Sequence, residues 1–224
     1  MKNGYNSKSG IIYCQTRKKC EEISLFLKEY GICTEAYHAG FTKKQKHEIE
    51  DRWKKNETLI MVATIAFGMG IDKADVRFVI HSNLPFSIEN YYQEIGRSGR
   101  DGLNSDCILY YSDVDRVNAM KLTNYSLKQN ITSRKMLENR KKERTLAYNR
   151  LLAFENFCTN QECCRHVMIS KYLGETGLKA CGKSCDNCIK TKSVKDVTPL
   201  AKSILLTIKN LGDDSLKSRI KIHY

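Results

Sequence analysis

The sequence predicts an α/β fold, with a parallel sheet in one lobe and a mainly helical region after it. Three observations support this prediction. Short apolar runs alternate with helical stretches up to Asp113, strand signals almost disappear from there to Tyr172, and six of the ten cysteines lie between Cys158 and Cys188. Alternating strands and helices are typical of parallel sheets, whose crossover connections are right-handed.

The first strand and the first helix are expected between Gly10 and Gly31. Gly10–Cys14 is a short apolar run, as a buried strand would be. A helical pattern follows and ends at Gly31, because glycine readily terminates helices. The expected apolar side of this helix carries Cys20, Ile23, Leu25, Phe26 and Leu27.

The second strand is expected over Cys33–Tyr37, with a helix after it. Thr42 can cap that helix, which runs to about Lys54. Its charged residues gather on one face, and Ile49 and Trp53 lie on the other. We therefore expect this helix to cover the sheet through its apolar face.

Three further strands and one helix complete the predicted lobe. Leu59–Ala63 is apolar along its whole length, as strands buried on both faces are. Val76–His81 is the fourth strand, and Ser87 opens a helix that runs through Ile95. Cys107–Tyr111 is the fifth strand.

The composition limits the classes of function. The 224 residues include 38 Lys+Arg against 25 Asp+Glu, for a formal net charge of +13. A hydrophobic content of 41% is enough to bury a core and excludes wholesale disorder. No apolar run approaches the roughly 18 residues of a membrane span, and residues 1–10 are too polar for a signal peptide. The charge indicates a polyanionic partner, either nucleic acid or an anionic membrane surface.

The strongest local signal is the glycine-rich stretch Gln93–Gly102, which follows a predicted helix and precedes a strand. Its two arginines, Arg97 and Arg100, are separated only by Ser98 and Gly99. Guanidinium groups match phosphate oxygens and stay charged, so such a pair can stabilise charge on a transferred phosphoryl group. The alternative is a glycine-rich loop with exposed arginines.

A second stretch, Val62–Asp72, continues from the end of a predicted strand, where ligands of α/β sheets gather. Gly68 and Gly70 let the backbone approach a phosphate, and Thr64 offers a hydroxyl. Asp72 could accept a hydrogen bond from a ribose hydroxyl. Ordinary packing of apolar residues and glycines explains the same pattern.

The cysteine cluster indicates a metal site. Cys181, Cys185 and Cys188 lie within eight residues, and the last two have the spacing of tetrahedral zinc sites. The fourth ligand must lie upstream; free structural cysteines are the alternative. The overlapping Gly177–Ser184 matches the P-loop pattern, but a P-loop needs a strand before it and a helix after it, so we reject it as a phosphate site.

The stretch Arg134–Arg150 is strongly basic, with seven Lys/Arg against Glu138 and Glu143. A solvated helix face and a nucleic-acid contact explain this pattern equally well.

Together these motifs resemble the second RecA-like lobe of the RecQ family of DNA helicases. Gly10–Arg17 is similar to the family's motif IV, Val62–Asp72 to motif V and Gln93–Gly102 to motif VI. Tyr37–Phe41 and the strand Val76–His81 also match, in the same order. The resemblance continues through the cysteine cluster to about Pro199.

The resemblance implies roles for the motif residues. Arg97 and Arg100 would face the γ-phosphate of ATP, with Arg100 as the arginine finger. Asp72 would touch the nucleotide ribose, Gln93 would lie near the cleft between the lobes, and Gly70 would approach the nucleotide.

The resemblance also implies a path for single-stranded DNA. Thr16, Arg17, His38 and Thr64 would lie along its phosphate backbone. For His38, a packed or surface histidine is an equally good interpretation.

For zinc, the resemblance favours Cys164 as the fourth ligand, because Cys164-Arg165-His166 is similar to the start of the family's zinc subdomain. A helix N-terminus at Cys164 would also favour its thiolate. Cys163 and His166 are alternatives for this position. The ion would be structural.

The domains expected from the resemblance are a second RecA-like lobe at 1–115, a helical zinc-binding subdomain at 116–192, and the start of a winged-helix region or a basic tail at 193–224. In this family the first lobe supplies the P-loop and an Asp-Glu box, which this sequence does not contain. ATP and Mg²⁺ would therefore be bound jointly with that lobe, and we expect the isolated chain to be inactive.

The implied activity is that of an ATP-dependent 3′-to-5′ DNA helicase in repair and recombination, with DNA and no membrane as partner. Two alternatives stay open: a non-catalytic, zinc-dependent nucleic-acid-binding module, and the same engine acting on RNA. A eukaryotic source would place the protein in the nucleus, and another source in the cytoplasm. The oligomeric state is not indicated.

Overall fold

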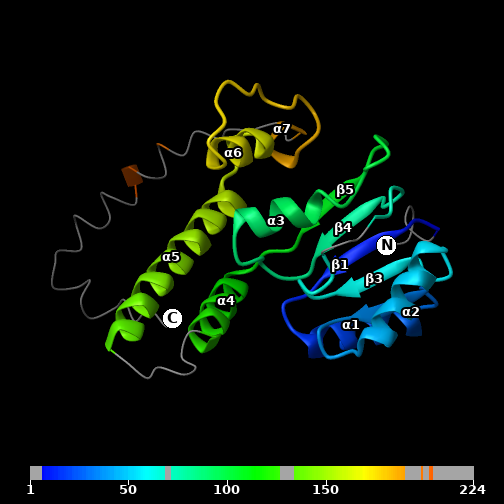
Figure 1. The fold of residues 1–224 in the computed structure, drawn as a ribbon. Coiled ribbons are helices and arrows are strands. Elements are labelled where there is room, and N and C mark those ends of the chain that lie inside the picture. The colour runs from blue at the N-terminus through cyan, green and yellow to red at the C-terminus, as the bar shows by residue number, and fades with distance from the viewer. Residues whose placement is uncertain (1–6, 69–71, 127–133, 190–197, 199–201, 204–224) are drawn as a thin grey trace.

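The computed structural model describes residues 7–68, 72–126, 134–189, 198 and 202–203. Five parallel strands form one sheet in the order β2-β3-β1-β4-β5. The strands end at a common edge of the sheet, here called the carboxyl edge (Figure 1). They are β1 (Gly10–Tyr13), β2 (Thr34–Tyr37), β3 (Ile60–Ala63), β4 (Phe78–His81) and β5 (Asp106–Leu109). This confirms the predicted α/β lobe.

The two faces of the sheet are covered by different elements. Helix α1 (Arg17–Glu29) covers one face, where Cys20 and Leu27 pack against Ile12 and Val62. On the other face, Ile49 and Trp53 of α2 (Lys43–Lys54) pack with Ile11, Tyr13 and Phe67. Helix α3 (Ile88–Ile95) connects β4 to β5, and Ile95 joins the core of the α2 face. Neighbouring residues of β1 thus face opposite cores, as the pleat requires.

Helix starts in this lobe follow the expected capping chemistry. The side chains of Thr16, Thr42 and Ser87 accept hydrogen bonds from backbone N–H groups in the first turns of α1, α2 and α3. Thr42 and Gln45 form a full capping box.

Some expected core positions were wrong. Leu25 and Phe26 of α1 are exposed, because the narrow buried stripe of this helix follows Cys20, Ser24 and Leu27. The Phe26 ring instead lies 4.8 Å from that of Tyr30. Of the cysteines outside the cluster, Cys14 and Cys20 are buried as expected. Cys33 and Cys107 are exposed; Cys107 lies on the edge strand β5, whose first residues are open to solvent.

The second region is helical, as predicted. It contains α4 (Asp113–Ser126), α5 (Arg134–Thr159), α6 (Arg165–Tyr172) and the short α7 (Asp186–Ile189). No helix among the described residues is both long and apolar enough to cross a membrane. Leu151, Phe154 and Phe157 of α5 pack against Ile88 and Tyr91 of α3, in one buried cluster. The helical region is therefore joined to the lobe through α3 (Figure 1).

Candidate functional site

The four residues expected along single-stranded DNA lie at the carboxyl edge. Thr16 and Arg17 follow β1, His38 follows β2 and Thr64 follows β3, and these three strands are neighbours in the sheet. Thr16 and Arg17 are exposed, whereas Thr64 is 9% exposed and its N–H donates to Tyr37 O at 3.1 Å. The structure thus brings them to one edge, with different accessibility.

His38 is buried, with both ring nitrogens engaged. Its Nδ1 accepts a hydrogen bond from the Gly40 N–H at 3.1 Å, so its Nε2–H donates to Glu21 at 2.9 Å. The ring also stacks on Phe41 at 4.2 Å. These contacts match the packed interpretation of His38, in which it shapes the turn at Gly40 and the neighbouring Arg17 stays accessible.

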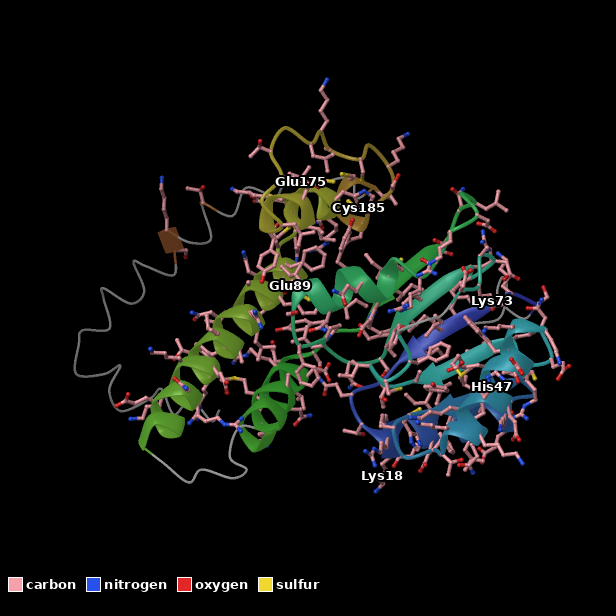
Figure 2. All side chains as sticks on the ribbon, viewed as in Figure 1. Lys18, His47, Lys73, Glu89, Glu175 and Cys185 are labelled. Carbon is pink, nitrogen blue, oxygen red and sulfur yellow. The ribbon has the colours of Figure 1, made fainter. Side chains whose placement is uncertain are left out.

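Sequence reasoning missed the lysines beside these residues. The first turns of α1 and α2 both begin at the carboxyl edge and carry no acidic residue. Lys18 lies at the exposed start of α1 (Figure 2). A helix N-terminus already favours anions, and basic side chains add to that field. The signal in the sequence is a threonine followed by consecutive basic residues: Thr16 before Arg17, Lys18 and Lys19, and Thr42 before Lys43 and Lys44.

We expected the motif V stretch (Val62–Asp72) to lie at the carboxyl edge, but only part of it does. Thr64 lies there, but Phe67 is buried over the α2 face, where its carbonyl accepts from Tyr13 Oη at 3.0 Å. Asp72 lies 3.8 Å from Arg100, and Arg100 belongs to the loop that precedes β5. The stretch therefore has contacts both at the carboxyl edge and towards the opposite, amino edge. Gly70 lies outside the described residues.

Arg97 lies close to the backbone of this stretch. A Cβ atom at Gly68 would come within 3.1 Å of Arg97 Nη2, so glycine leaves room for the guanidinium. Arg97 Nε is buried, and among the described residues no acceptor bonds to it. A buried guanidinium N–H without an acceptor is suited to an anion such as a phosphate oxygen.

Arg100 is more accessible than Arg97. Its side chain is 37% exposed and faces Asp72, whose side chain is 94% exposed. Gln93 is exposed on α3, four residues before Arg97. The structure therefore brings Asp72 and Arg100 together and places Arg97 beside Gly68 of the motif V stretch.

The loop that carries the arginines is held at both ends. Before it, buried His81 of β4 bonds to Glu94 of α3, with 2.7 Å between Nε2 and Oε2. After it, Arg77 binds both carboxylate oxygens of Asp101, at 2.7 and 2.6 Å, and this guanidinium lowers the pKa of Asp101. These supports were not apparent in the sequence, because each joins residues from different elements.

The four cysteines predicted as metal ligands form one cluster. The sulfurs of Cys164, Cys181, Cys185 and Cys188 lie within 4.8 Å of one another, and Cys164 Sγ is 3.9 Å from Cys185 Sγ. Zinc–sulfur bonds of about 2.3 Å in a tetrahedron place the sulfurs about 3.8 Å apart. The arrangement supports one structural zinc ion. Cys163 and His166, the alternatives for the fourth position, are exposed.

Electrostatics in the cluster also favour a cation. Burial raises the pKa of Cys164, but N–H donors from Cys181, Val167 and His166 outweigh it and lower that pKa to about 6. Neighbouring thiols raise the pKa of Cys188 to about 12. Four thiolates at this spacing therefore need a metal ion to neutralise them.

Side chains around the cluster fix the short helix α7. Arg165 binds both carboxylate oxygens of Asp186, at 2.9 and 3.0 Å, and stacks on Phe157 of α5. Buried Asn187 donates to the carbonyls of Asn160 and Cys163, at 3.0 and 2.8 Å. Such contacts around metal ligands orient them. The segment Gly177–Ser184 is a turn-rich loop with neither strand nor helix, which agrees with rejecting it as a P-loop.

The zinc region also touches α3 directly. Tyr172 of α6 donates to Glu89 of α3 at 3.1 Å, and Arg150 of α5 lies 3.8 Å from the same carboxylate oxygen. Glu89 marks the meeting point of these helices in Figure 2. Helix α3, which leads into the arginine loop, is thus held by both α5 and α6.

Two family models match successive regions of the chain. The chain matches the model of the helicase conserved C-terminal domain over residues 3–102 and that of the RecQ zinc-binding region over residues 111–189. The described fold is also similar to the solved structure of the E. coli DEAD-box protein SrmB, with 24% identity and a TM-score of 0.48 over 55% of this chain and 72% of that chain.

Curated relatives match nearly the whole chain. The mouse (Mus musculus) ATP-dependent DNA helicase Q1 is 39% identical over 92% of this chain and 29% of its own length. The Arabidopsis thaliana ATP-dependent DNA helicase Q-like 2 is 40% identical over 89% of this chain and 26% of its own length. The Saccharomyces cerevisiae ATP-dependent helicase SGS1 is 37% identical over 96% of this chain and 14% of its own length. The chain thus spans less than a third of each of these relatives.

Both family models match in chain order, and each coincides with a region seen in the structure: the parallel lobe and the four-cysteine helical region. The chain belongs to the RecQ family of helicases, of which it carries the helicase C-terminal domain and the zinc-binding region.

Proposed function

We propose that this chain is the second motor lobe and zinc-binding region of an ATP-dependent 3′-to-5′ DNA helicase. The observation that carries the proposal is the placement of the motif V stretch. It has Thr64 at the basic carboxyl edge and Asp72 beside Arg100 near the opposite edge. One stretch of chain therefore connects a surface suited to a phosphate backbone with a surface suited to a nucleotide.

On the nucleotide side, Arg100 would face the γ-phosphate, and Asp72 would accept from the ribose. Arg97, whose Nε has no acceptor among the described residues, would contribute a second phosphate contact. Gln93 and Gly70 complete the proposed set near the cleft with the first lobe. ATP and Mg²⁺ would be held jointly with that lobe, which in this family carries the P-loop.

On the DNA side, Thr16, Arg17 and Thr64 would contact the phosphate backbone, supported by the lysines of α1 and α2. We propose that His38 acts there by shaping the turn at Gly40. Zinc would be held by Cys164, Cys181, Cys185 and Cys188. The proposed regions are the lobe at 1–115, the zinc-binding region at 116–192 and the start of a winged-helix region or basic tail at 193–224. Within the last of these, only Thr198, Lys202 and Ser203 are among the described residues, and Pro199 and Leu200 are not.

The proposed role lies in repair and recombination of DNA, in the nucleus if the source is eukaryotic and in the cytoplasm otherwise. Competition between single-stranded DNA and RNA for the complete protein tests the choice of nucleic acid. Stronger binding and stronger ATPase stimulation by RNA would overturn the DNA assignment.

The division of labour between the lobes can be measured. We expect the purified 224-residue chain to hydrolyse no ATP above background, because among the described residues no strand–P-loop–helix is present. The complete protein should show DNA-stimulated hydrolysis. Turnover by this chain alone would contradict the joint site, and the absence of DNA-stimulated turnover in the complete protein would contradict the helicase proposal.

The basic carboxyl edge predicts a specific salt dependence. Changing both Lys43 and Lys44 to Ala should weaken binding of single-stranded DNA and make the slope of log K against log salt shallower by about 1.4, because two phosphate contacts are lost. Fluorescence anisotropy at several salt concentrations measures this slope. Lys28→Ala together with Lys54→Ala, at exposed positions near the ends of α1 and α2, is the control. Equal slopes for the two double variants would show that α2 does not contact the strand.

A further inference from the structure

The chain's single tryptophan contacts both Phe67 of the motif V stretch and Lys73, the residue that directly follows that stretch. Trp53 of α2 is 1% exposed. The Phe67 ring meets its indole edge-on, with centroids 5.4 Å apart and an interplanar angle of 76°. The ammonium of Lys73 lies over the same ring, 5.4 Å from its centroid. Phe67 and Lys73, six residues apart in the sequence, therefore both pack against the Trp53 side chain.

Lys73 is buried, which is unusual for a lysine unless its charge is compensated. Its Nζ donates to Asn56 Oδ1 at 2.8 Å and lies 3.0 Å from Asp75 Oδ1. Asn56 has a φ of 62° in the turn after α2, a left-handed conformation that asparagine tolerates. A carboxylate, an amide oxygen and an indole face thus hold one ammonium group, at the position shown in Figure 2.

The neighbour of Lys73 is the residue assigned to the nucleotide. Asp72 has a side chain that is 94% exposed and lies 3.8 Å from Arg100. Its own side chain is open to solvent, and the next residue, Lys73, is the first after it whose side chain is buried. Displacing the Lys73 ammonium would therefore free the backbone that presents Asp72 to Arg100.

We propose that Lys73 is a positioning residue: by binding Trp53 and Asn56 it holds Asp72 beside Arg100, ready for a nucleotide. This inference rests on the proposed nucleotide role of Asp72. It extends that role, because Lys73 itself touches neither the nucleotide nor the strand. Because Trp53 contacts Lys73, the fluorescence of Trp53 also reports whether Lys73 is in place.

The first measurement uses the 224-residue chain and its tryptophan fluorescence. Lys73→Met keeps the length of the side chain and removes the ammonium, so Trp53 should become more accessible to acrylamide. Lys73→Arg keeps a cation over the indole and should restore protection. Lys54→Met, which removes an exposed lysine next to Trp53 in the sequence, is the control. Unchanged quenching in Lys73→Met would overturn the anchoring.

The second measurement uses steady-state ATPase of the complete protein. Lys73→Met should raise the KM for ATP about tenfold, equivalent to about 1.4 kcal/mol, while kcat changes little. Saturating nucleotide selects the anchored arrangement, so the loss appears in apparent affinity. A merely structural role would lower the active fraction and thus kcat, with KM unchanged. That pattern would overturn the proposal.

Two further variants keep the outcome interpretable. If Lys73→Met does not fold, Asn56→Gly removes one partner of Lys73 without straining the left-handed turn, and it should raise KM in the same direction. Asp72→Ala separates this inference from the function it rests on. If Asp72→Ala raises KM but the Lys73 and Asn56 variants do not, the anchor is wrong. If Lys73→Met exposes Trp53 but Asp72→Ala leaves KM unchanged, the anchor stands and the nucleotide role of Asp72 is wrong.

Discussion

Replacing Cys185 with serine should remove zinc from the chain and unfold the part of the helical region that follows α6. The reason is that burial does not hold this segment together: between Leu173 and Ser184 every residue except Cys181 is exposed. The cluster of four sulfurs is its main crosslink to α6. Structural zinc contributes about 10–16 kcal/mol of apparent binding free energy in small zinc domains, which exceeds what α7 could supply by packing.

The measurement is zinc content by mass spectrometry of the purified chain, combined with limited proteolysis. We expect one zinc per chain in the unchanged protein, none in Cys185→Ser, and new cleavage between Leu173 and Ile189. Cys163→Ser is the matched control, because Cys163 adjoins Cys164 but is exposed. A Cys185→Ser chain that keeps zinc and resists protease would contradict the assigned ligands. Loss of zinc in Cys163→Ser would instead assign the fourth position to Cys163.

Loss of zinc should also affect the structure outside the cysteine cluster. Ile169 of α6 shares a buried core with Ile88 and Tyr91 of α3, and Tyr172 donates to Glu89. Helix α3 leads directly into the loop of Arg97 and Arg100. Loss of zinc should therefore weaken one support of the arginine loop, although His81 and Glu94 hold that loop from the sheet side. Zinc-free complete protein should accordingly lose ATPase activity together with its protease resistance.

Most of the lobe could be predicted from the sequence, because its signals are local. Apolar runs marked the five strands within a few residues, and Thr16, Thr42 and Ser87 marked the helix starts. The spacing of Cys185 and Cys188 indicated a metal site before any fold was known. These features depend on residues close together in the chain, where periodicity, capping and ligand spacing act directly.

Features that depend on the path of the chain could not be predicted. Leu25 and Phe26 satisfy an apolar helix pattern, but only three-dimensional packing shows that α1 buries the stripe beside them. Similarly, the composition of the motif V stretch does not show that Thr64 and Asp72 lie towards opposite edges of the sheet. The burial of Lys73 against Trp53 is not apparent in the sequence, since it joins the loop before β4 to the end of α2.

Replacing Arg100 with alanine in the complete protein should lower kcat for ATP about a thousandfold, the lower end of what an arginine finger contributes to phosphoryl transfer. Arg100 suits this role better than Arg97 because its side chain is more open, while Arg97 lies against Gly68 with its Nε buried. Arg100→Lys should recover only part of the rate, since an ammonium keeps the charge but lacks the fork that matches phosphate oxygens.

DNA affinity should stay largely unchanged in Arg100→Ala, because Arg100 lies near the amino edge of the sheet and the basic surface lies at the carboxyl edge. Single-turnover ATP hydrolysis and fluorescence anisotropy with single-stranded DNA, measured on the same preparation, separate the two effects. Lys54→Ala, at an exposed position at the end of α2, controls for the loss of one positive charge. Loss of DNA binding with preserved turnover would assign Arg100 to the strand instead. Equal losses in Arg100→Ala and Lys54→Ala would show that net charge, and not the position beside Asp72, sets the rate.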